Sequence, residues 1–349
     1  MSVLSRFTGW VLCVTAVAAA ELCSRVPCTA DTWSVVNLNP ASARSSIALA
    51  VGSGLQGGVA SYPAAGSRAA IWQGTAASYE VLYPMAESYV RDIAGTEKVG
   101  SGGAADQQHA LLWQGPGNAM TDLHPAGATS SEAFGLSAGA QAGVAFATVG
   151  ADLPLGYHAA LWYGSAGSFV DLSPVGSTAS VALGIDGSAQ IGNFRQDERS
   201  GEHAALWYGT AESVVDLHPT EAYASSAQAI SNGRQGGYVQ FERDGPCHAA
   251  LWSGTAESFF DLNAPGGPTI SGAIYGMDGN VQVGQAGFVD GTGGATIWFG
   301  TPESAFFLGG LLPDGYTKSE ARAVDIDEFG TIRVVGYAYN NNYYLPDGT

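Results

Sequence analysis

A tryptophan-bearing segment recurs six times along the chain, and this repeat limits the fold more than any other feature. The copies combine a stretch of the type HAALW with a glycine-containing turn and a stretch of the type VVDLHP, and they carry Trp72, Trp113, Trp162, Trp207, Trp252 and Trp298. Spacings of about 40–50 residues are typical of repeat arrays, in which each unit buries its apolar face against its neighbours. The sequence therefore predicts an array of similar units.

Each unit contains four short segments with strand character. The first is small and alternating, as in Ser226 to Ile230, and a glycine-rich turn leads to a second run such as Val281 to Gln285. A loop of variable length then precedes the HAALW stretch, and a four-residue turn of the type GTAE precedes the last stretch. Short strands between glycine and proline turns, without a helical period, predict an all-β fold. Four strands in about 40–45 residues indicate the blade of a β-propeller.

The two ends of the chain complete the count of strands. Residues 32–40 read as a fourth strand that precedes the first full unit, whereas the last second strand is Arg333 to Tyr337. Tyr343 to Pro346 is a degenerate candidate for the last third strand. We therefore predict a seven-bladed β-propeller of four-stranded blades, closed by the N-terminal strand that completes the last blade. Such closure removes the exposed sheet edges of an open array.

The first twenty residues have the layout of a secretory signal peptide. Arg6 precedes an uncharged apolar run over 7–20, and Ala18 and Ala20 form a cleavage site before Glu21. This run is shorter than the roughly 20 residues of a membrane-spanning helix. We expect a signal peptide over 1–20, a tail over 21–31 and a propeller domain over 32–349, in a secreted, extracellular or periplasmic monomer with no integral membrane segment after signal cleavage. The alternatives are a short N-terminal anchor or a buried segment.

The charge balance argues against one class of partner. Thirteen lysines and arginines stand against 31 aspartates and glutamates, which gives a net charge of −18. A nucleic-acid-binding protein needs a basic face to neutralise phosphates, so we expect no nucleic-acid partner. The apolar fraction of 46% is sufficient for a core. The acidic composition suits solubility in salt or avoidance of anionic surfaces, but it identifies no partner.

Three cysteines follow the predicted signal peptide. Cys23 and Cys28 are close enough in sequence for a local disulfide in an oxidising compartment, and the sequence leaves open whether it forms. Cys247 then has no partner of its own. We interpret it as a buried, unreactive thiol within the repeat array.

The repeats resemble the HAF-type extracellular repeat family, whose units carry a His-Ala-Phe-Leu-Trp stretch, an Asp-Leu stretch and a Val-Gly stretch. The match is carried by His158, Leu161, Trp162, Asp171 and Leu172, and by His203, Trp207, Asp216 and Leu217. The units depart from the family pattern with alanine at the phenylalanine position, Arg68 and Gly294 at the histidine position, and Val81 and Phe307 at the aspartate position. The resemblance implies an exported bacterial protein, and it brings no known reaction or ligand.

All six histidines stand at repeat positions. If Tyr208 lies opposite Ser213 in the hairpin of the third and fourth strands, His203 faces His218 and Asp216 is its diagonal neighbour. We therefore expect a hydrogen bond between the repeated histidine and aspartate, which would lock each blade. The pairs that carry this prediction are His158 with Asp171 and His203 with Asp216. The alternative is a ligand or metal site.

Two local motifs suggest chemistry but lack its context. Residues 135–139 read G-x-S-x-G, yet the strand–turn–helix surroundings of a nucleophile elbow are absent, and Asp186 and Asp278 hold the place of Ser137 in sister units. We expect a turn there. Residues 325–328 form a dense acidic run without the calcium-loop pattern, so we expect a solvated turn, with a calcium site as the alternative. The sequence predicts no catalytic residues, metal or cofactor.

Two charged loops are the candidate binding surface. They lie over 193–202 and 240–246, between second and third strands, where the units differ most. Because propeller loops of this kind share one face, we expect their charged residues to lie close together on its rim. The predicted patch consists of Arg195, Asp197, Glu198, Arg199, Glu242, Arg243 and Asp244. The alternative is ordinary solvated loop charge.

These observations favour an exported, non-catalytic propeller that serves as a binding or structural module for an unknown extracellular protein or glycan. The alternative is a carbohydrate-active hydrolase or lyase that uses the loop face, an analogy with other propellers. A third interpretation is a degenerate repeat protein with only a packing role in an envelope.

Overall fold

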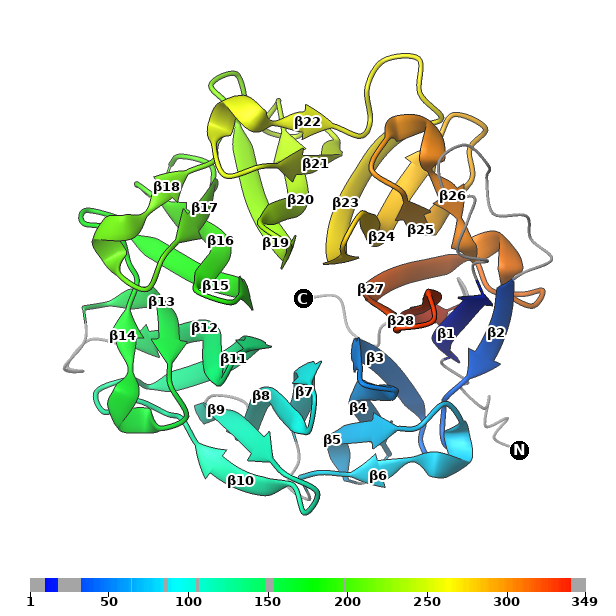
Figure 1. Cartoon of the computed structure of the whole chain (residues 1–349), viewed down its shortest axis with the longest axis horizontal. Coiled ribbons are helices and arrows are strands. Elements are labelled where there is room, and N and C mark those ends of the chain that lie inside the picture. The colour runs from blue at the N-terminus through cyan, green and yellow to red at the C-terminus, as the bar shows by residue number, and fades with distance from the viewer. Residues whose placement is uncertain are drawn as a thin grey trace, which may run out of the picture.

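The computed structural model describes residues 10–17, 33–63, 65–83, 87–104, 107–147, 154–197 and 199–339. Within these ranges the chain folds into four-stranded antiparallel sheets joined by turns and short 3-10 helices. The sheets surround a central axis; the first strand lies nearest to it in six of them, and β27 (Lys318–Ile326) does so in the sheet that the chain ends share (Figure 1). The predicted all-β propeller of four-stranded blades is therefore confirmed.

Six of the described sheets each come from one repeat unit, and their strands follow one another outward in chain order. Blade 1 contains β3 (Ser45–Gly52), β4 (Leu55–Tyr62), β5 (Gly66–Trp72) and β6 (Glu80–Val81). Blade 2 contains β7 (Ser88–Ala94), β8 (Glu97–Ala104), β9 (Gln107–Gln114) and β10 (Ala119–Asp122). Blade 3 contains β11 (Ser130–Ser137), β12 (Ala140–Ala147), β13 (Gly156–Trp162) and β14 (Val170–Asp171).

The next three blades repeat this order. Blade 4 contains β15 (Ala179–Asp186), β16 (Ala189–Arg195), β17 (His203–Trp207) and β18 (Val215–Asp216). Blade 5 contains β19 (Ala224–Ser231), β20 (Arg234–Gln240), β21 (Cys247–Trp252) and β22 (Phe260–Asp261). Blade 6 contains β23 (Thr269–Asp278), β24 (Val281–Phe288), β25 (Gly293–Trp298) and β26 (Phe306–Phe307).

The two ends of the described chain share one further sheet, in the order β2-β1-β28-β27. β27 (Lys318–Ile326) and β28 (Thr331–Tyr339) come from the C-terminal part, and β1 (Trp10–Val17) and β2 (Trp33–Asn37) from the N-terminal part. β1 pairs with β28 over Thr331 to Ala338, and β2 pairs with β1. Residues 33–37 thus form an outer strand. The position beside β28, where we expected Tyr343 to Pro346, is taken by β1, and residues 343–346 lie outside the described ranges.

β1 also changes the interpretation of the N-terminal segment. It is formed by residues of the apolar run that we predicted to be part of a signal peptide. Alternating Val, Cys and Thr residues suit a strand as well as a leader. The structure therefore places the middle of this apolar run in a sheet, and cleavage before Glu21 stays a prediction. Cys23 and Cys28 lie outside the described residues.

The third and fourth strands form a tighter hairpin than the sequence indicates. The GTAE-type turn is a 3-10 helix in five blades: η2 (Ala76–Ser78), η3 (Ala166–Ser168), η4 (Ala211–Ser213), η5 (Ala256–Ser258) and η6 (Pro302–Ser304). A last 3-10 helix, η7 (Leu308–Leu311), connects blade 6 to β27. Because the turn is helical, the fourth strand shortens to two residues in these blades. The predicted register is confirmed, since Ala205 pairs with Asp216 and Tyr208 N donates to Ser213 Oγ at 2.8 Å.

The six repeated tryptophans are almost completely buried. Each packs against the preceding blade, as Trp207 does against Leu161 and Leu172, and Trp252 does against Leu206 and Leu217. Replacing a buried aromatic residue of this size by alanine costs about 3–5 kcal/mol. The tryptophans therefore supply much of the adhesion between blades.

The innermost strand of each sheet has a β-bulge near the axis. The pairing register skips one residue in each of these strands, and the skipped residues are Leu49, Arg91, Phe134, Leu183, Gln228, Tyr275 and Arg322. All seven line a central cavity of about 170 Å³. A bulge re-aims a side chain, so each sheet presents its skipped residue to the axis, and the seven comprise leucine, arginine, phenylalanine, glutamine and tyrosine.

Candidate functional site

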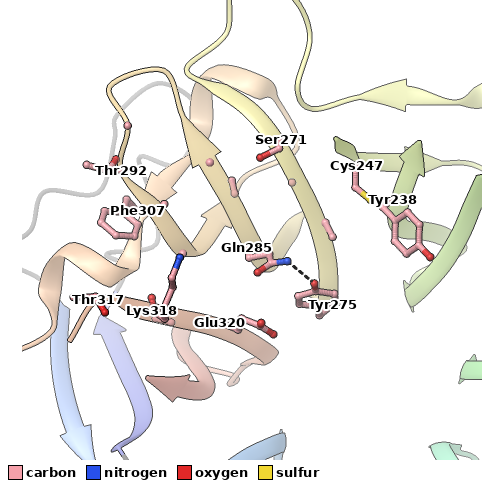
Figure 2. A pocket seen from close by; sticks show the side chains of 18 of the residues that line it. Tyr238, Cys247, Ser271, Tyr275, Gln285, Thr292, Phe307, Thr317, Lys318 and Glu320 are labelled. Carbon is pink, nitrogen blue, oxygen red and sulfur yellow. Dashed lines mark hydrogen bonds between the residues drawn. The ribbon is translucent and has the colours of Figure 1, made fainter. Parts of the chain in front are cut away.

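A cavity of about 910 Å³ opens on the face that carries the loops between second and third strands. It lies beside blade 6, between the edge of blade 5 and β27 (Figure 2). Its floor is made of small residues, namely Gly272, Ala273, Ala286, Gly287, Gly293 and Gly294. Its walls carry the aromatic residues Tyr238, Tyr275, Phe307 and Tyr339, and the polar residues Ser271, Gln285, Thr292, Thr317, Lys318, Ser319 and Glu320.

Beside this cavity, blade 6 lacks the long side chain that its sister blades carry at one position. In the β-ladders, Gly294 of blade 6 stands where blade 4 has His203, and its partner Ala286 stands where blade 4 has Phe194. The other five repeat blades carry arginine or histidine at the position of Gly294. At the aspartate position blade 6 has Phe307, which pairs with Thr296 as Asp216 pairs with Ala205.

Two of these glycines are required by the backbone. Gly294 has a φ of +141°, and a Cβ there would lie 2.6 Å from Ser319 Oγ. A Cβ on Gly287 would lie 2.8 Å from Ser271 Oγ. Both distances are shorter than real Cβ contacts, so the close approach of β25 to β27 and of β24 to β23 depends on glycine at these positions. The open floor is therefore built into the packing of the strands.

Tyr275 and Tyr238 are the buried tyrosines of the cavity wall. Gln285 Nε2 donates a hydrogen bond of 2.9 Å to the Tyr275 hydroxyl (Figure 2). Burial raises the pKa of both phenols to about 12. Each hydroxyl is therefore protonated at neutral pH and is available as a donor as well as an acceptor.

An ion pair lies between this cavity and the central cavity. The Arg322 guanidinium contacts the Glu320 carboxylate at 2.5 Å and lies 4.5 Å from the centroid of the Tyr275 ring. Glu320 lines the large cavity, whereas Arg322 is the bulge residue that lines the axis. The carboxylate is thus neutralised by a neighbouring cation, and the tyrosine ring is held in place by a cation–π contact.

Cys247 lines the same cavity at the start of β21. It is a half-buried free thiol, and burial raises its pKa. The reactive form of cysteine is the thiolate. The prediction of a buried thiol is therefore wrong in part, since Cys247 is half-buried, and its low reactivity stays a prediction.

The predicted loop patch does not line this cavity. Arg195 pairs with Glu202 at 3.1 Å beside a smaller cavity of about 260 Å³ between blades 3 and 4. Asp197 accepts hydrogen bonds from the backbone of its own loop, at Arg199 N and Ser200 N. Glu198 lies outside the described residues. This first loop is therefore organised mainly by its own contacts.

The second charged loop meets the first at Tyr223. Arg243 Nε donates to the Tyr223 hydroxyl at 3.0 Å, and the backbone of Gly201 approaches the carbonyl of Tyr223 closely. Glu242 and Asp244 are exposed in this loop. Among the described residues, the structure records no ion pair from one loop to the other. The two loops are neighbours, but their role as a binding patch stays a prediction.

The repeated histidines and aspartates contact each other as expected. His158 Nδ1 lies 2.8 Å from Asp171 Oδ2, and His203 Nδ1 lies 2.9 Å from Asp216 Oδ2. The same pair joins His109 to Asp122 and His248 to Asp261. The His203 ring stacks on His218 with centroids 3.9 Å apart. Because the aspartate also accepts a bond from the backbone N–H two residues later, it fixes the end of the fourth strand.

The two remaining motifs have structural roles. Ser137 Oγ accepts a hydrogen bond from Gly187 N, and Asp186 does the same from Asn232 N, so these residues link neighbouring blades. Asp327 accepts bonds from Phe329 N and Thr331 N and pairs with Arg333 at 2.7 Å. In the part of the chain that the structure describes, no group of three or more His, Cys, Asp or Glu side chains is arranged to hold a metal ion.

Solved structures with a similar arrangement of strands have low sequence identity to this chain. A puromycin-hydrolyzing peptidase of Mycobacterium tuberculosis matches with a TM-score of 0.52 and 16% identity, over 75% of this chain and 44% of that one. An acylaminoacyl peptidase of Pyrococcus horikoshii matches with a TM-score of 0.52 and 10% identity, over 80% and 47%. TolB from Acinetobacter baumannii matches with a TM-score of 0.46 and 9% identity, over 81% and 64%.

These likenesses concern the fold and only part of each matched protein. The chain spans less than two thirds of the length of each of the three proteins. At such identities the two matches with a TM-score of 0.52 show the propeller fold alone. No family model matches the chain, and no curated protein does either. None of the helices within the described ranges has the length and apolar character that crossing a bilayer demands.

Sequence reasoning missed the cavity, although its signal was present. The departures at Gly294 and Phe307 were visible as breaks in the repeat. They mark the blade that carries the cavity, because a lost side chain in a close-packed array leaves space. Tyr238, Tyr275 and Glu320 carried no such mark in the sequence, since they lie at positions where the units vary.

Proposed function

We propose that the protein is an exported, non-catalytic binding module of the HAF-type repeat class, and that the cavity beside blade 6 is its ligand site. The observation that carries this proposal is the place of the cavity, where one blade alone replaces the arginine or histidine of its sisters with glycine. Its volume falls within the roughly 300–1,000 Å³ of small-molecule sites. A polar, aromatic lining around a rigid floor suits a ligand more than it suits a packing role.

The protonation states in the cavity support binding without catalysis. The phenols of Tyr238 and Tyr275 and the thiol of Cys247 all have raised pKa values, so none of them is activated as a base or nucleophile. A glycosidase of the usual kind needs two carboxylates on either side of the scissile bond. Glu320 is the carboxylate among the described lining residues, and Arg322 neutralises it.

Cys247 offers a direct test of the site. We expect a ligand in the cavity to protect Cys247 from a maleimide, measured by mass spectrometry of the peptide that contains it. A bound small molecule that slows labelling several-fold, without turnover of that molecule, supports the proposal. Release of product from a glycan or peptide substrate would favour the hydrolase or lyase. If no compound in a broad chemical library protects Cys247, the cavity is not a ligand site.

We further propose that the sheet shared by the chain ends acts as the seventh blade and closes the ring. β1 and β2 cover the outer side of β28, which would otherwise be an exposed edge. Cleavage before Glu21 would remove β1 and leave β2 without the strand it pairs with. In that mature chain, residues 343–346 would have to pair with β28 instead.

Two truncations test this closure. We expect deletion of residues 340–349 to lower the melting temperature of a chain that begins at Glu21 by many degrees, or to cause aggregation. The same deletion should have little effect on the chain that keeps residues 1–20, because β1 already covers β28. N-terminal sequencing of secreted protein tells which form exists in the medium. Equal, small effects in both chains would contradict closure through this sheet.

A further inference from the structure

We propose that the ligand of the cavity is a neutral carbohydrate; this rests on the proposed function of the cavity as a binding site. A sugar presents flat apolar C–H faces together with hydroxyl groups that both donate and accept. The cavity offers matching surfaces of both kinds on rigid strands. The following contacts narrow the ligand to this class.

The aromatic walls supply the apolar surfaces. Tyr275 is fixed by its bond from Gln285 and by the Arg322 guanidinium 4.5 Å from its ring centroid. Tyr339 stacks on Tyr337 with centroids 6.1 Å apart, is 39% exposed and lines the cavity. Rigid aromatic rings of this kind give contact area at low entropic cost, and each tyrosine adds a polar end.

The polar lining consists mostly of groups that donate and accept in either direction. Ser271, Thr292 and Thr317 contribute hydroxyls, and Gln285 contributes an amide. The phenol hydroxyls of Tyr238 and Tyr275, which also line the cavity, are protonated at neutral pH like those of other tyrosines, so each can both donate and accept. Such a set matches sugar hydroxyls, whereas an anion would need several donors and a cation several acceptors.

The charges of the lining leave an ionic sugar a single partner, Lys318. The charged lining residues are Lys318 and Glu320, one of each sign, and Arg322 already neutralises Glu320. A uronic acid would meet one cation on a protein whose net charge is −18, and an amino sugar would meet a carboxylate that is already paired. A neutral saccharide needs no charged partner and can accept hydrogen bonds from Lys318 and donate them to Glu320.

The experiment uses neutral pentasaccharides of hexoses, pentoses and N-acetylhexosamines, with oligouronates and oligoglucosamines as charged probes. We expect at least one neutral pentasaccharide to bind by titration calorimetry and to slow maleimide labelling of Cys247. Binding should change little between 50 and 500 mM salt, because no net charge is paired.

Two substitutions of Tyr238 separate the contribution of its ring to binding affinity from that of its hydroxyl. Tyr238→Phe should weaken binding by about 2–10-fold, the value of one hydrogen bond, and Tyr238→Ala by more than about 10-fold. Tyr163→Ala is the matched control, since Tyr163 is exposed in blade 3 away from the cavity and its loss should leave affinity unchanged. Protection of Cys247 by an uncharged non-sugar or by a charged probe, with no neutral saccharide bound, would overturn the carbohydrate inference while leaving the binding function intact. Absence of any protecting compound would overturn both.

Discussion

Blade 4 and blade 6 share the same strand order, the same buried tryptophan and the same register, yet one is filled and the other is hollow. In blade 4, the His203 ring stacks on His218 and packs against the tilted ring of Phe194. In blade 6, the positions of Phe194 and His203 hold Ala286 and Gly294. Among the described repeat blades, glycine at the position of His203 occurs in blade 6 alone, so a repeat array can vary one unit while the neighbouring units keep the backbone in place.

The hollow blade keeps its packing by other means. Phe307, at the aspartate position, packs against Phe288 with ring centroids 5.9 Å apart. η7 follows directly, and its Leu308 is completely buried against Trp33 and the β27 side of the core. These apolar contacts replace the histidine–aspartate bond of blade 4. The cavity is therefore supported from the outside of the ring and does not need filling to be stable.

The largest difference between the two blades should appear when the Phe194 side chain is removed from blade 4. Phe194 is buried and its ring lies 5.5 Å from that of His203. We expect Phe194→Ala to lower the free energy of unfolding by about 3–5 kcal/mol, measured by urea denaturation with tryptophan fluorescence. A loss below about 1 kcal/mol would mean that blade 4 tolerates a cavity as blade 6 does.

The converse change introduces a phenylalanine into the cavity beside blade 6. Ala286 lies at the position of Phe194, against the cavity, so Ala286→Phe should change the free energy of unfolding by less than about 1 kcal/mol while abolishing ligand binding. The matched control is Ala145→Phe in blade 3, where the same position pairs with His158 and is completely buried. Overpacking there should cost about 1–3 kcal/mol. Equal costs in both blades would show that the space beside Ala286 is not open.

Much of the architecture could be predicted because the repeat exposes it. The tryptophan spacing, the four strands of each unit and the pairing of Tyr208 with Ser213 follow from periodicity and turn chemistry, and the structure has them. The shortness of the fourth strands could not be predicted from the sequence, since a GTAE-type segment is compatible both with a 3-10 helix and with a longer strand. The strand β1 did not follow either, because an apolar run that suits export also suits a sheet.

The site was less accessible to sequence reasoning for a physical reason. A charged loop is visible in a sequence, so Arg195 and Glu242 were easy to choose, whereas a cavity is made of residues that are small. The space beside Gly294 depends on three strands and on β27, which come together only in the fold. Two histidine–aspartate contacts were predictable, because both partners recur at a fixed register in a single hairpin.

The histidine–aspartate bond should matter more in blade 3 than in blade 4. His158 is 8% exposed and has a second contact, from Nε2 to the Pro154 carbonyl at 2.8 Å, whereas the Asp216 partner of His203 is 43% exposed. We expect His158→Ala to lower the unfolding free energy by about 1–3 kcal/mol, and His203→Ala by about 1 kcal/mol or less because water replaces the partner. Differential scanning calorimetry should show melting shifts of a few degrees in that order. Loss of ligand binding in either variant would contradict a purely structural role.

The smallest expected effect is on the pH dependence of the melting temperature, and it has opposite signs for His158 of blade 3 and His218 of blade 4. The hydrogen bond to Asp171 raises the pKa of His158, whereas burial, together with repulsion from His203, lowers the pKa of His218. The stabilisation from His158 is present below its unfolded value of about 6.5 and is lost as pH rises through its folded pKa. His218 resists protonation in the fold, so its blade loses stability as pH falls below about 6.5. His218→Ser, which copies Ser173 of blade 3, should therefore reduce the fall in melting temperature between pH 8 and about pH 5.5, a change of at most a few degrees. His158→Ala should enlarge that fall in melting temperature. If both variants changed the fall in the same direction, the opposite pKa shifts of His158 and His218 would be contradicted.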